Sequence, residues 1–262
     1  MSTRTYVVTG AASGIGKATT DHLKSQGHKV IGVDLRDTDV NVDLTSTEGR
    51  EELVARAKAL SGGTIDGIVA VAGLVAGIPA TVGVNYFGAV ATLEGLRPLL
   101  AGSDAPRAAV VASLAALEET DDGLLAACLA DDEPRALDEA RRIGTAVNAT
   151  GSSTIYTSTK LAIARWVRKH APTPEWAGAG IALNAIAPGV IATPMTAPAL
   201  ATEEGRAALD AGAPSPLNGP AAPPEAPAKL LAWLTSEENT NVTGQIIFID
   251  GGSDCIRRPE LV

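Results

Sequence analysis

The chain has 262 residues, of which 45% are apolar and 19% charged, and a formal net charge of −9 at pH 7. This length and balance predict a globular protein with a sizeable core, built as one large α/β domain or two small ones. The negative charge and the lack of any block of Lys and Arg argue against nucleic-acid binding.

Short apolar runs alternate with longer helical patterns along the chain. Strands are predicted at residues 5–9, 29–33, 66–71, 107–112, 180–186 and 244–249. Helices are predicted at residues 14–26, 46–60, 82–100, 155–170 and 225–235. This alternation predicts an α/β protein with a single doubly wound Rossmann-type parallel sheet and helices on both faces. No repeat or linker divides the chain, so we expect residues 1–262 to form a single domain.

Three features bear on location. The first strand begins at Thr5, which leaves no room for a signal peptide. The uncharged stretch 67–93 is long enough to span a bilayer, but Pro79 and several glycines interrupt it, so we expect a strand, loop and helix and no membrane association. The two cysteines, Cys128 and Cys255, are too few for a disulfide framework and favour free thiols in a reducing cytoplasm.

A glycine-rich turn, TGAASGIG, follows the first predicted strand and opens a helix. Gly10, Gly14 and Gly16 allow a tight turn whose N–H groups approach a pyrophosphate. Asp34 ends the second strand, where a carboxylate binds the adenosine ribose hydroxyls. That carboxylate repels the 2′-phosphate of NADP, and Ser13 supplies no compensating charge, so we expect NAD as the cofactor.

Tyr156 lies four residues before Lys160 in a predicted helix, so both side chains project from the same side. A tyrosine phenol titrates near about 10, and a nearby ammonium lowers that pKa towards neutrality. The pair is therefore a candidate acid–base device. The spacing alone also fits a solvated helix face on which Tyr156 packs and Lys160 points into water.

Together these motifs resemble the short-chain dehydrogenase/reductase family, and the resemblance covers nearly the whole chain in the family's order. The residues that carry it are Gly10, Gly14 and Gly16, Asp43 in NVDLT, Asn85 in VNYFG, Ser113, Tyr156 with Lys160, NAIAPG at 184–189 and IDGG at 249–252.

The resemblance implies four catalytic residues. Tyr156 is expected to exchange a proton with the reacting oxygen, Lys160 to lower its pKa and hold the nicotinamide ribose, and Ser113 to hydrogen-bond that oxygen. Asn85 is expected to support a water-linked proton path to Lys160. The cofactor contacts implied are Gly10, Ser13, Gly14, Ile15, Gly16, Asp34, Leu35, Asp43, Leu44, Ala72, Gly73, Tyr156, Lys160, Pro188, Gly189, Ile191 and Thr193.

Other catalytic classes find less support. His22, His28 and His170 lie far apart without companion ligands, so we expect no metal site. No G-x-S-x-G elbow stands in a strand–helix turn, which argues against a hydrolase.

The chain departs from the family pattern at three places. Ala70-Val71-Ala72-Gly73 stands where many members have a paired asparagine, and Thr159 stands where serine is common. Forty-three positions separate Ser113 from Tyr156, so we expect a helical insertion at about 116–150, read as two short helices joined around Pro134.

The Pro/Ala-rich stretch at about 190–224 is expected to form a substrate lid, with Met195, Leu200 and Leu209 on its apolar face. We expect a homodimer through the C-terminal helix and strand, with the insertion covering a surface that otherwise builds a tetramer.

The insertion resembles the bacterial 3α-hydroxysteroid dehydrogenase/carbonyl reductase branch of the family. This implies an NAD-dependent oxidoreductase that interconverts an alcohol and a carbonyl on a bulky apolar substrate. Alternatives are a coniferyl-type aryl alcohol dehydrogenase, a non-catalytic NAD-binding sensor and, less favoured by the Tyr–Lys pair, a Rossmann-type methyltransferase.

Overall fold

A computed structural model describes residues 3–147 and 152–260. Within these residues seven parallel strands form one sheet in the order β3-β2-β1-β4-β5-β6-β7. The strands are β1 Thr5–Thr9, β2 Lys29–Asp34, β3 Val40–Asn41, β4 Gly67–Ala70, β5 Arg107–Val111, β6 Ala182–Pro188 and β7 Ile246–Ile249. The predicted doubly wound α/β class is confirmed.

The α-helices of the described chain run between and after the strands. They are α1 Gly14–Ser25, α2 Thr47–Ser61, α3 Pro79–Val82, α4 Ala89–Leu96, α5 Asp122–Leu129, α6 Glu133–Ile143, α7 Thr154–His170, α8 Ala197–Leu200, α9 Glu203–Gly212, α10 Glu225–Leu234 and α11 Ser253–Arg257. A π-helical turn, η1 Gly83–Gly88, joins α3 to α4, and short 3₁₀ turns occur at η2 Arg97–Gly102, η3 Leu114–Leu117 and η4 Ala177–Ala179.

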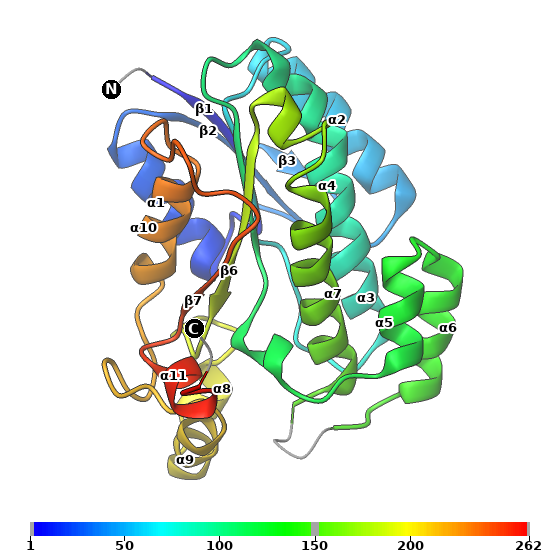
Figure 1. Cartoon of the computed structure of the whole chain (residues 1–262), viewed down its shortest axis with the longest axis vertical. Helices are drawn as coiled ribbons and strands as arrows, with labels where there is room; N and C mark the ends of the chain where they lie inside the picture. The colour runs from blue at the N-terminus through cyan, green and yellow to red at the C-terminus, as the bar shows by residue number, and fades with distance from the viewer. Residues whose placement is uncertain (1–2, 148–151, 261–262) are drawn as a thin grey trace.

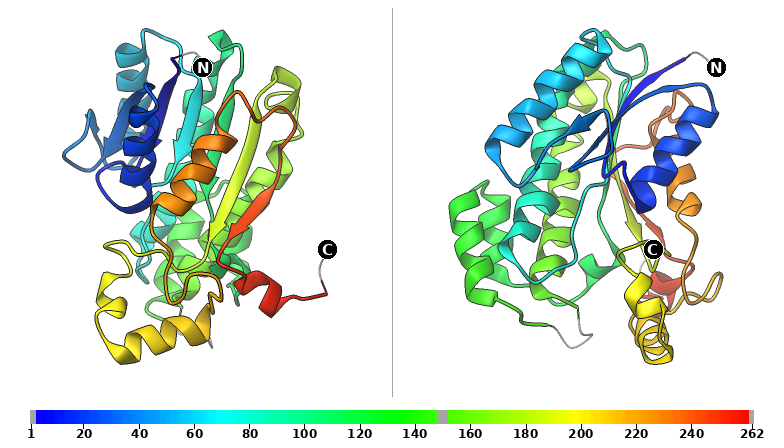
Figure 2. Two further views of the ribbon diagram at one scale, coloured as in Figure 1. Left: turned by 90° about the vertical axis from the view of Figure 1, so that its left-hand side faces the viewer. Right: turned by 180° about the vertical axis from the view of Figure 1, so that it is seen from behind.

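Helices cover both faces of the sheet (Figure 1, Figure 2). Helices α2, α4 and α7 lie on one face, and α1 packs beside α10 on the other. Each face has its own apolar core, because central strands such as β4 are buried on both sides. The carboxyl ends of the strands lie at the lower end of the view in Figure 1, together with α8, α9 and α11.

The helix predicted at 82–100 is interrupted, which the apolar pattern did not indicate. Gly83 and Gly88 bring the π turn close to the loop before α2: a Cβ atom on Gly88 would lie 3.0 Å from the Cβ atom of Leu44, and one on Gly83 would lie 3.2 Å from that of Thr45. The two glycines therefore allow a close approach that fixes this turn against the loop.

Strand boundaries also differ from the prediction. The two-residue strand β3 was not predicted, because so short a segment carries no alternating pattern. Strand β6 continues to Pro188 instead of ending at residue 186, and β7 begins at Ile246 because Gly244, at φ +70°, lies outside extended geometry.

The predicted insertion forms two helices, α5 and α6, which pack on each other and on α7. Side chains of Asp121 and Asp132 cap them by accepting hydrogen bonds from Leu124 N and Arg135 N. The joint lies at residues 130–132, since Pro134 already stands in the first turn of α6. Residues 148–151 of the predicted insertion lie outside the described residues.

The segment predicted as a lid contains helices α8 and α9, which extend from the carboxyl end of the sheet (Figure 2). No helix in the described ranges is both long and apolar enough to cross a membrane.

Candidate active site

A cavity of about 600 Å³ opens at the carboxyl ends of the strands. Every residue predicted to contact the cofactor lines it, and so does Ser113. Asn85, the remaining predicted site residue, lies behind the wall and is 2% exposed. Residues between positions 10 and 193 that were predicted to form the site thus lie together at the edge of the sheet where ligands bind in doubly wound folds.

The three glycines of the loop stand where a side chain would strain or crowd the backbone. Gly10 and Gly14 adopt φ values of +69° and +52°, which glycine reaches without strain. A Cβ atom on Gly16 would lie 2.1 Å from the carbonyl oxygen of Gly10. The turn therefore packs closely against the start of α1, which leaves backbone N–H groups at a helix N-terminus as an anion cradle. These residues fit the pyrophosphate of a dinucleotide.

Asp34 lies at the end of β2 and lines the same cavity. Its carboxylate accepts hydrogen bonds from Ala12 N at 3.0 Å and Leu35 N at 2.7 Å, so the backbone fixes its position. The Arg36 side chain is 86% exposed and lies 3.9 Å from the carboxylate of Asp37. The local charge at this part of the cavity is therefore negative, which fits a carboxylate that binds ribose hydroxyls.

Two side chains pin the loop that follows β4. The hydroxyl of Thr9 accepts hydrogen bonds from Val71 N at 3.0 Å and Ala72 N at 3.1 Å. Asn85 holds Leu74 from both sides, accepting from its N–H and donating to its carbonyl oxygen, each at 2.8 Å. Ala70 and Val71, which stand where many family members have asparagines, offer no polar side chain here, and Thr9 supplies an anchor from the neighbouring strand.

The predicted catalytic pair lies on α7. Ser153 caps the helix by accepting from Tyr156 N at 3.5 Å. The Nζ atom of Lys160 donates to the carbonyl oxygen of Val111 at 2.9 Å. Ser113 lies two residues beyond Val111, and its hydroxyl accepts from Ala115 N and hydrogen-bonds the Tyr156 phenol. Three groups from two elements therefore meet at one end of the cavity.

The pKa of Tyr156 differs in sign from the prediction. Burial raises the pKa of the phenol, the Ser113 hydrogen bond opposes that rise, and the carboxylate of Glu118 adds to it. Burial also lowers the pKa of Lys160 to about 8. The expected lowering of the Tyr156 pKa is wrong for this structure, because loss of solvation is the largest influence on the phenol.

A further wall of the cavity comes from the end of β6 and the segment that follows it. Pro188, Gly189, Ile191 and Thr193 line the cavity, and the Thr193 side chain packs against Gly14. The Thr196 hydroxyl fixes this turn by donating to Ile191 O at 2.5 Å and accepting from Thr193 N at 3.1 Å. This turn is therefore in direct contact with the glycine loop.

Several lining residues were not predicted. Glu118 is the notable one, since its side chain is 8% exposed, lines the cavity and pairs with Arg257 at 3.5 Å. Helix α7 holds the following segment, because Thr157 donates to Glu119 O and Ser158 accepts from Asp121 N. No local motif marks Glu118, because its ion-pair partner, Arg257, lies near the C-terminus.

Within residues 3–147 and 152–260 no three His, Cys, Asp or Glu side chains are grouped to hold a metal ion. Cys128 is buried and Cys255 exposed, and both are free thiols.

Comparisons with known proteins agree with this geometry. Residues 6–114 match the NAD dependent epimerase/dehydratase family, and residues 142–254 match a family described as enoyl-(acyl carrier protein) reductase. A 3-alpha-hydroxysteroid dehydrogenase/carbonyl reductase of Comamonas testosteroni is 35% identical over 97% of each chain. The chain belongs to the short-chain dehydrogenase/reductase family. The resemblance seen in the motifs is therefore confirmed, and the protein is an oxidoreductase of this family.

Two further relatives match this short-chain dehydrogenase/reductase over nearly its whole length. The structure of the 3-alpha-hydroxysteroid dehydrogenase from Pseudomonas sp. B-0831, complexed with NADH, matches with a TM-score of 0.85 and 32% identity, covering 98% of this chain and 100% of that one. A cis-4-hydroxycyclohexanecarboxylate dehydrogenase of Sinomonas cyclohexanicum is 31% identical over 95% of this chain and 96% of its own.

Proposed function

We propose that this enzyme interconverts an alcohol and a carbonyl on a bulky apolar substrate with NAD(H), in the manner of a 3α-hydroxysteroid dehydrogenase/carbonyl reductase. The observation that carries the proposal is the meeting of Ser113, Tyr156 and Lys160 in a cavity that also holds the glycine loop and Asp34. The NADH-bound Pseudomonas relative and the Comamonas relative support both the cofactor and the substrate class.

The proposed roles follow from the position of each group. NAD(H), when bound, supplies or accepts the hydride. The Tyr156 phenol gives its proton to the carbonyl oxygen in reduction and takes one from the hydroxyl in oxidation, while Ser113 hydrogen-bonds that oxygen. Lys160 would hold the nicotinamide ribose. Asn85 fixes the loop at Leu74 and supports a proton path towards Lys160.

The cofactor is held by the remaining predicted residues. The glycine loop would bind the pyrophosphate, Asp34 the adenosine ribose, and Asp43 with Leu44 the adenine edge. Pro188, Gly189, Ile191 and Thr193 would form the nicotinamide end. We propose NAD over NADP, because the nearest arginine after Asp34 extends into solvent.

The substrate part of the cavity is mainly apolar. Its walls include Leu114 and Ala115 after β5, Met195 before α8, and Ala199 and Leu209 on α8 and α9. These side chains fit a hydrocarbon framework and supply little hydrogen bonding, while the polar groups gather near Tyr156. A ring system that carries one reacting oxygen suits this division.

We propose that residues 190–224 act as a lid. Met195 is 45% exposed although it lines the cavity, and Leu209 is half-buried on α9, so a bound substrate would cover apolar surface that now faces solvent. Leu200, predicted for the same face, is half-buried but does not line the cavity. Limited proteolysis tests this: cleavage within the segment should slow when NADH and a substrate analogue are present, and equal cleavage would contradict a lid.

A screen by NADH fluorescence tests the function. Purified protein would be assayed against steroids, aromatic alcohols and quinones with NAD or NADH. We expect turnover of steroid alcohols or ketones above that of coniferyl-type alcohols. A preference for aryl alcohols would favour the coniferyl-type alternative, and NADH binding without turnover of any class would favour a sensor.

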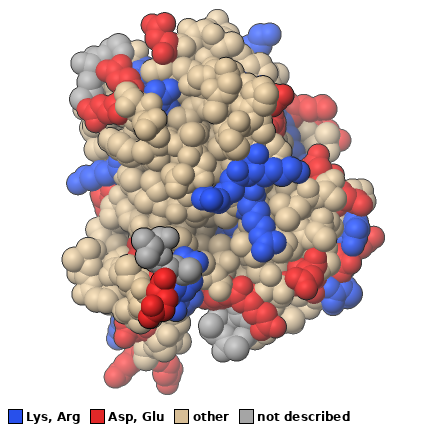
Figure 3. Space-filling model, viewed as in Figure 1, with Lys and Arg blue, Asp and Glu red and all other residues tan. Residues whose placement is uncertain are grey.

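We also propose a homodimer through α10 and β7. Trp233 on α10 is 39% exposed, and all four residues of β7, the last strand of the sheet, are half-buried. An apolar edge strand beside an exposed tryptophan favours contact with a second copy. Helix α7 is less suitable, because Arg165, Arg168 and Lys169 are exposed on it, and Lys and Arg side chains gather on the face seen in Figure 3. A cytoplasmic location remains a prediction, supported by the two free thiols.

A further inference from the structure

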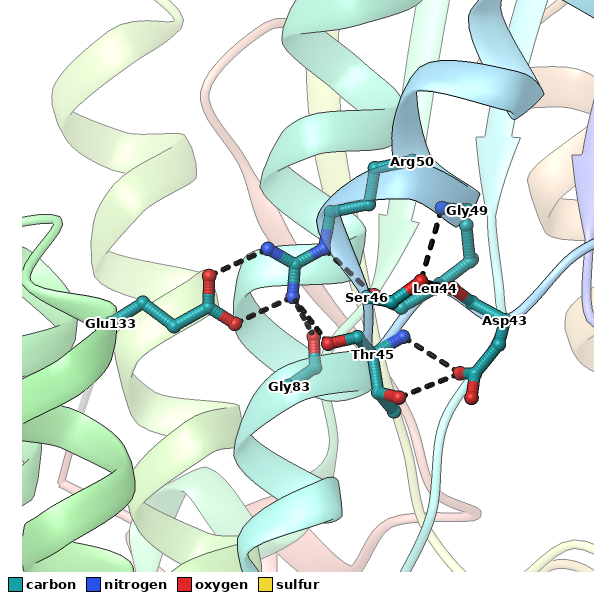
Figure 4. Close-up of polar contacts among 8 residues, drawn as sticks. All are labelled: Asp43, Leu44, Thr45, Ser46, Gly49, Arg50, Gly83 and Glu133. Atoms are coloured by element: carbon teal, nitrogen blue, oxygen red, sulfur yellow. Dashed lines mark hydrogen bonds and ion pairs between the residues drawn. The ribbon is translucent and has the colours of Figure 1, made fainter.

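Arg50, in the first turn of α2, joins three parts of the molecule (Figure 4). Its Nε atom donates to Leu44 O at 2.7 Å, and one terminal nitrogen donates to Thr45 O at 3.4 Å and Gly83 O at 3.2 Å. Both terminal nitrogens donate to the carboxylate of Glu133 at 2.7 Å. One guanidinium thus ties the loop before α2 and the π turn to the inserted helix α6.

The pair is shielded from solvent. The side chains of Arg50 and Glu133 are 11% and 26% exposed, and the guanidinium carbon lies 5.9 Å from the ring centroid of Phe87. A bidentate pair in such a place is stronger and more directional than a surface pair. Arg141 and Asp138 on the same helix show the contrast, since their side chains are 62% and 76% exposed. Glu133 also stands in the first turn of α6, where a negative charge is favourable.

The loop that Arg50 holds is part of the cavity wall. Asp43, Leu44 and Thr45 line the cavity on the side of Asp34. The Asp43 carboxylate accepts from Thr45 N at 2.9 Å and the Thr45 hydroxyl at 2.7 Å. A Cβ atom on Gly49 would lie 2.0 Å from the Asp43 carbonyl oxygen, so the loop is pressed against α2. Its shape therefore depends on the contacts that Arg50 makes.

We propose that Glu133 is a positioning residue for the cofactor: through Arg50 it fixes the Asp43–Thr45 loop in the shape that receives the adenosine half of NAD(H). The inference rests on the proposed function, which assigns this loop to the adenosine end. It gives the insertion a role in cofactor affinity, although none of its helix α6 lines the cavity in the described chain. Without Glu133 the Arg50 guanidinium keeps its backbone carbonyl acceptors and the Phe87 ring but loses its charged partner, so it is held less firmly.

The test compares two ligands. NADH carries the adenosine half, and reduced nicotinamide mononucleotide lacks it. For Glu133→Ala we expect the Kd of NADH, measured by fluorescence, to rise about tenfold, the effect of losing one shielded pair. The Kd of the mononucleotide should stay within about twofold, and kcat at saturating NADH should likewise change less than about twofold.

Asp138→Ala is the matched control, because it breaks an exposed ion pair on the same helix and should leave both Kd values unchanged. Glu133→Gln keeps a hydrogen-bond acceptor and the size of the side chain, so its Kd for NADH should lie between those of the wild type and Glu133→Ala. If the alanine variant folds poorly, Glu133→Gln replaces it in the test. Unchanged NADH affinity in both Glu133 variants overturns the inference. Equal weakening for both ligands also overturns it, since that indicates general loosening.

The inference and the proposed function fail in different ways. If the wild-type protein binds NADH no better than the mononucleotide, the assignment of the loop to adenosine is wrong. The proposed function and the inference are then both contradicted. Tight NADH binding by the wild type and by both Glu133 variants removes only the inference.

Discussion

The Nζ atom of Lys160 lies 5.7 Å from the ring centroid of Tyr156 and is turned towards the carbonyl oxygen of Val111. Lys160 is 5% exposed, and Val111 O is the acceptor for its Nζ atom close to the Tyr156 phenol. Burial acts on both groups: it raises the pKa of Tyr156 and lowers that of Lys160.

Tyr156→Phe removes the proton donor and leaves the ring in place. Since a positioned general acid contributes at least about 10²-fold, we expect kcat to fall by that factor while NADH still binds with wild-type affinity. Steady-state kinetics and NADH fluorescence give the two readings. Turnover retained in this variant would place the acid–base step on another group.

Glu118→Gln removes a carboxylate that raises the pKa of Tyr156. Carbonyl reduction needs the protonated phenol, so activity falls as pH rises through that pKa. We therefore expect the basic limb of the kcat/KM profile for reduction to move to lower pH in the variant. Glu119→Gln, which changes the adjacent exposed residue, is the matched control. Superimposable profiles for wild type and Glu118→Gln would contradict the prediction.

Lys160→Met should stabilise the fold while it abolishes activity. Burial lowers the pKa of Lys160 from 10.5 to about 8, so the charged form is disfavoured in the folded state. Below pH 8 the wild type carries this cost, which is at most about 3 kcal/mol, and the variant does not. The cost disappears as pH rises from 8 to 10.5, because the unfolded chain binds the extra proton there. Urea unfolding at pH 7 and pH 10 should show the variant's advantage shrinking; a lower free energy of unfolding at pH 7 would rule this out.

Cofactor preference follows from the negative adenosine end. We expect kcat/KM with NAD(H) to exceed that with NADP(H) by at least about tenfold, or about 1.4 kcal/mol of transition-state binding. Asp34→Asn should bring the kcat/KM values for the two cofactors closer together, because it removes the charge and keeps one acceptor for the backbone N–H groups. Asp37→Asn, which changes an exposed carboxylate nearby, should not. Equal efficiency with both cofactors in the wild type would refute the assignment.

Assembly is tested at Trp233. Light scattering should give the wild type a mass of about twice the 26.5 kDa of one chain. In Trp233→Asp the measured mass should fall towards that of the monomer. Leu60→Asp is the control, since Leu60 on α2 is also 39% exposed. A stable tetramer with an interface that includes residues 116–150 would show that the insertion mediates assembly.

The sheet and the glycine loop were accessible from sequence because local patterns determine them. Buried parallel strands are continuous apolar runs, and a phosphate-binding turn needs glycines at fixed positions. The Tyr156–Lys160 pair was found for the same reason, since one helical turn fixes the spacing. Each of these features is encoded within a few consecutive residues.

Features that depend on distant partners were not predicted. Arg50 meets Glu133, and Glu118 meets Arg257, across separations that no motif spans. The sign of the Tyr156 pKa shift was missed because it depends on burial by the surrounding fold. The break in the helix predicted at 82–100 depends on the close approach of Gly83 and Gly88 to the loop before α2.

Thr9 secures the chain directly after β4, where Ala70-Val71 stands in place of the paired asparagine of many family members. Its hydroxyl accepts from two consecutive N–H groups in the loop that follows β4, so one residue on β1 fixes a turn that begins 62 positions later in the chain. Thr9→Val keeps the size of the side chain and removes the acceptor, so the Val71 and Ala72 N–H groups lose their partner and this wall of the cavity should loosen.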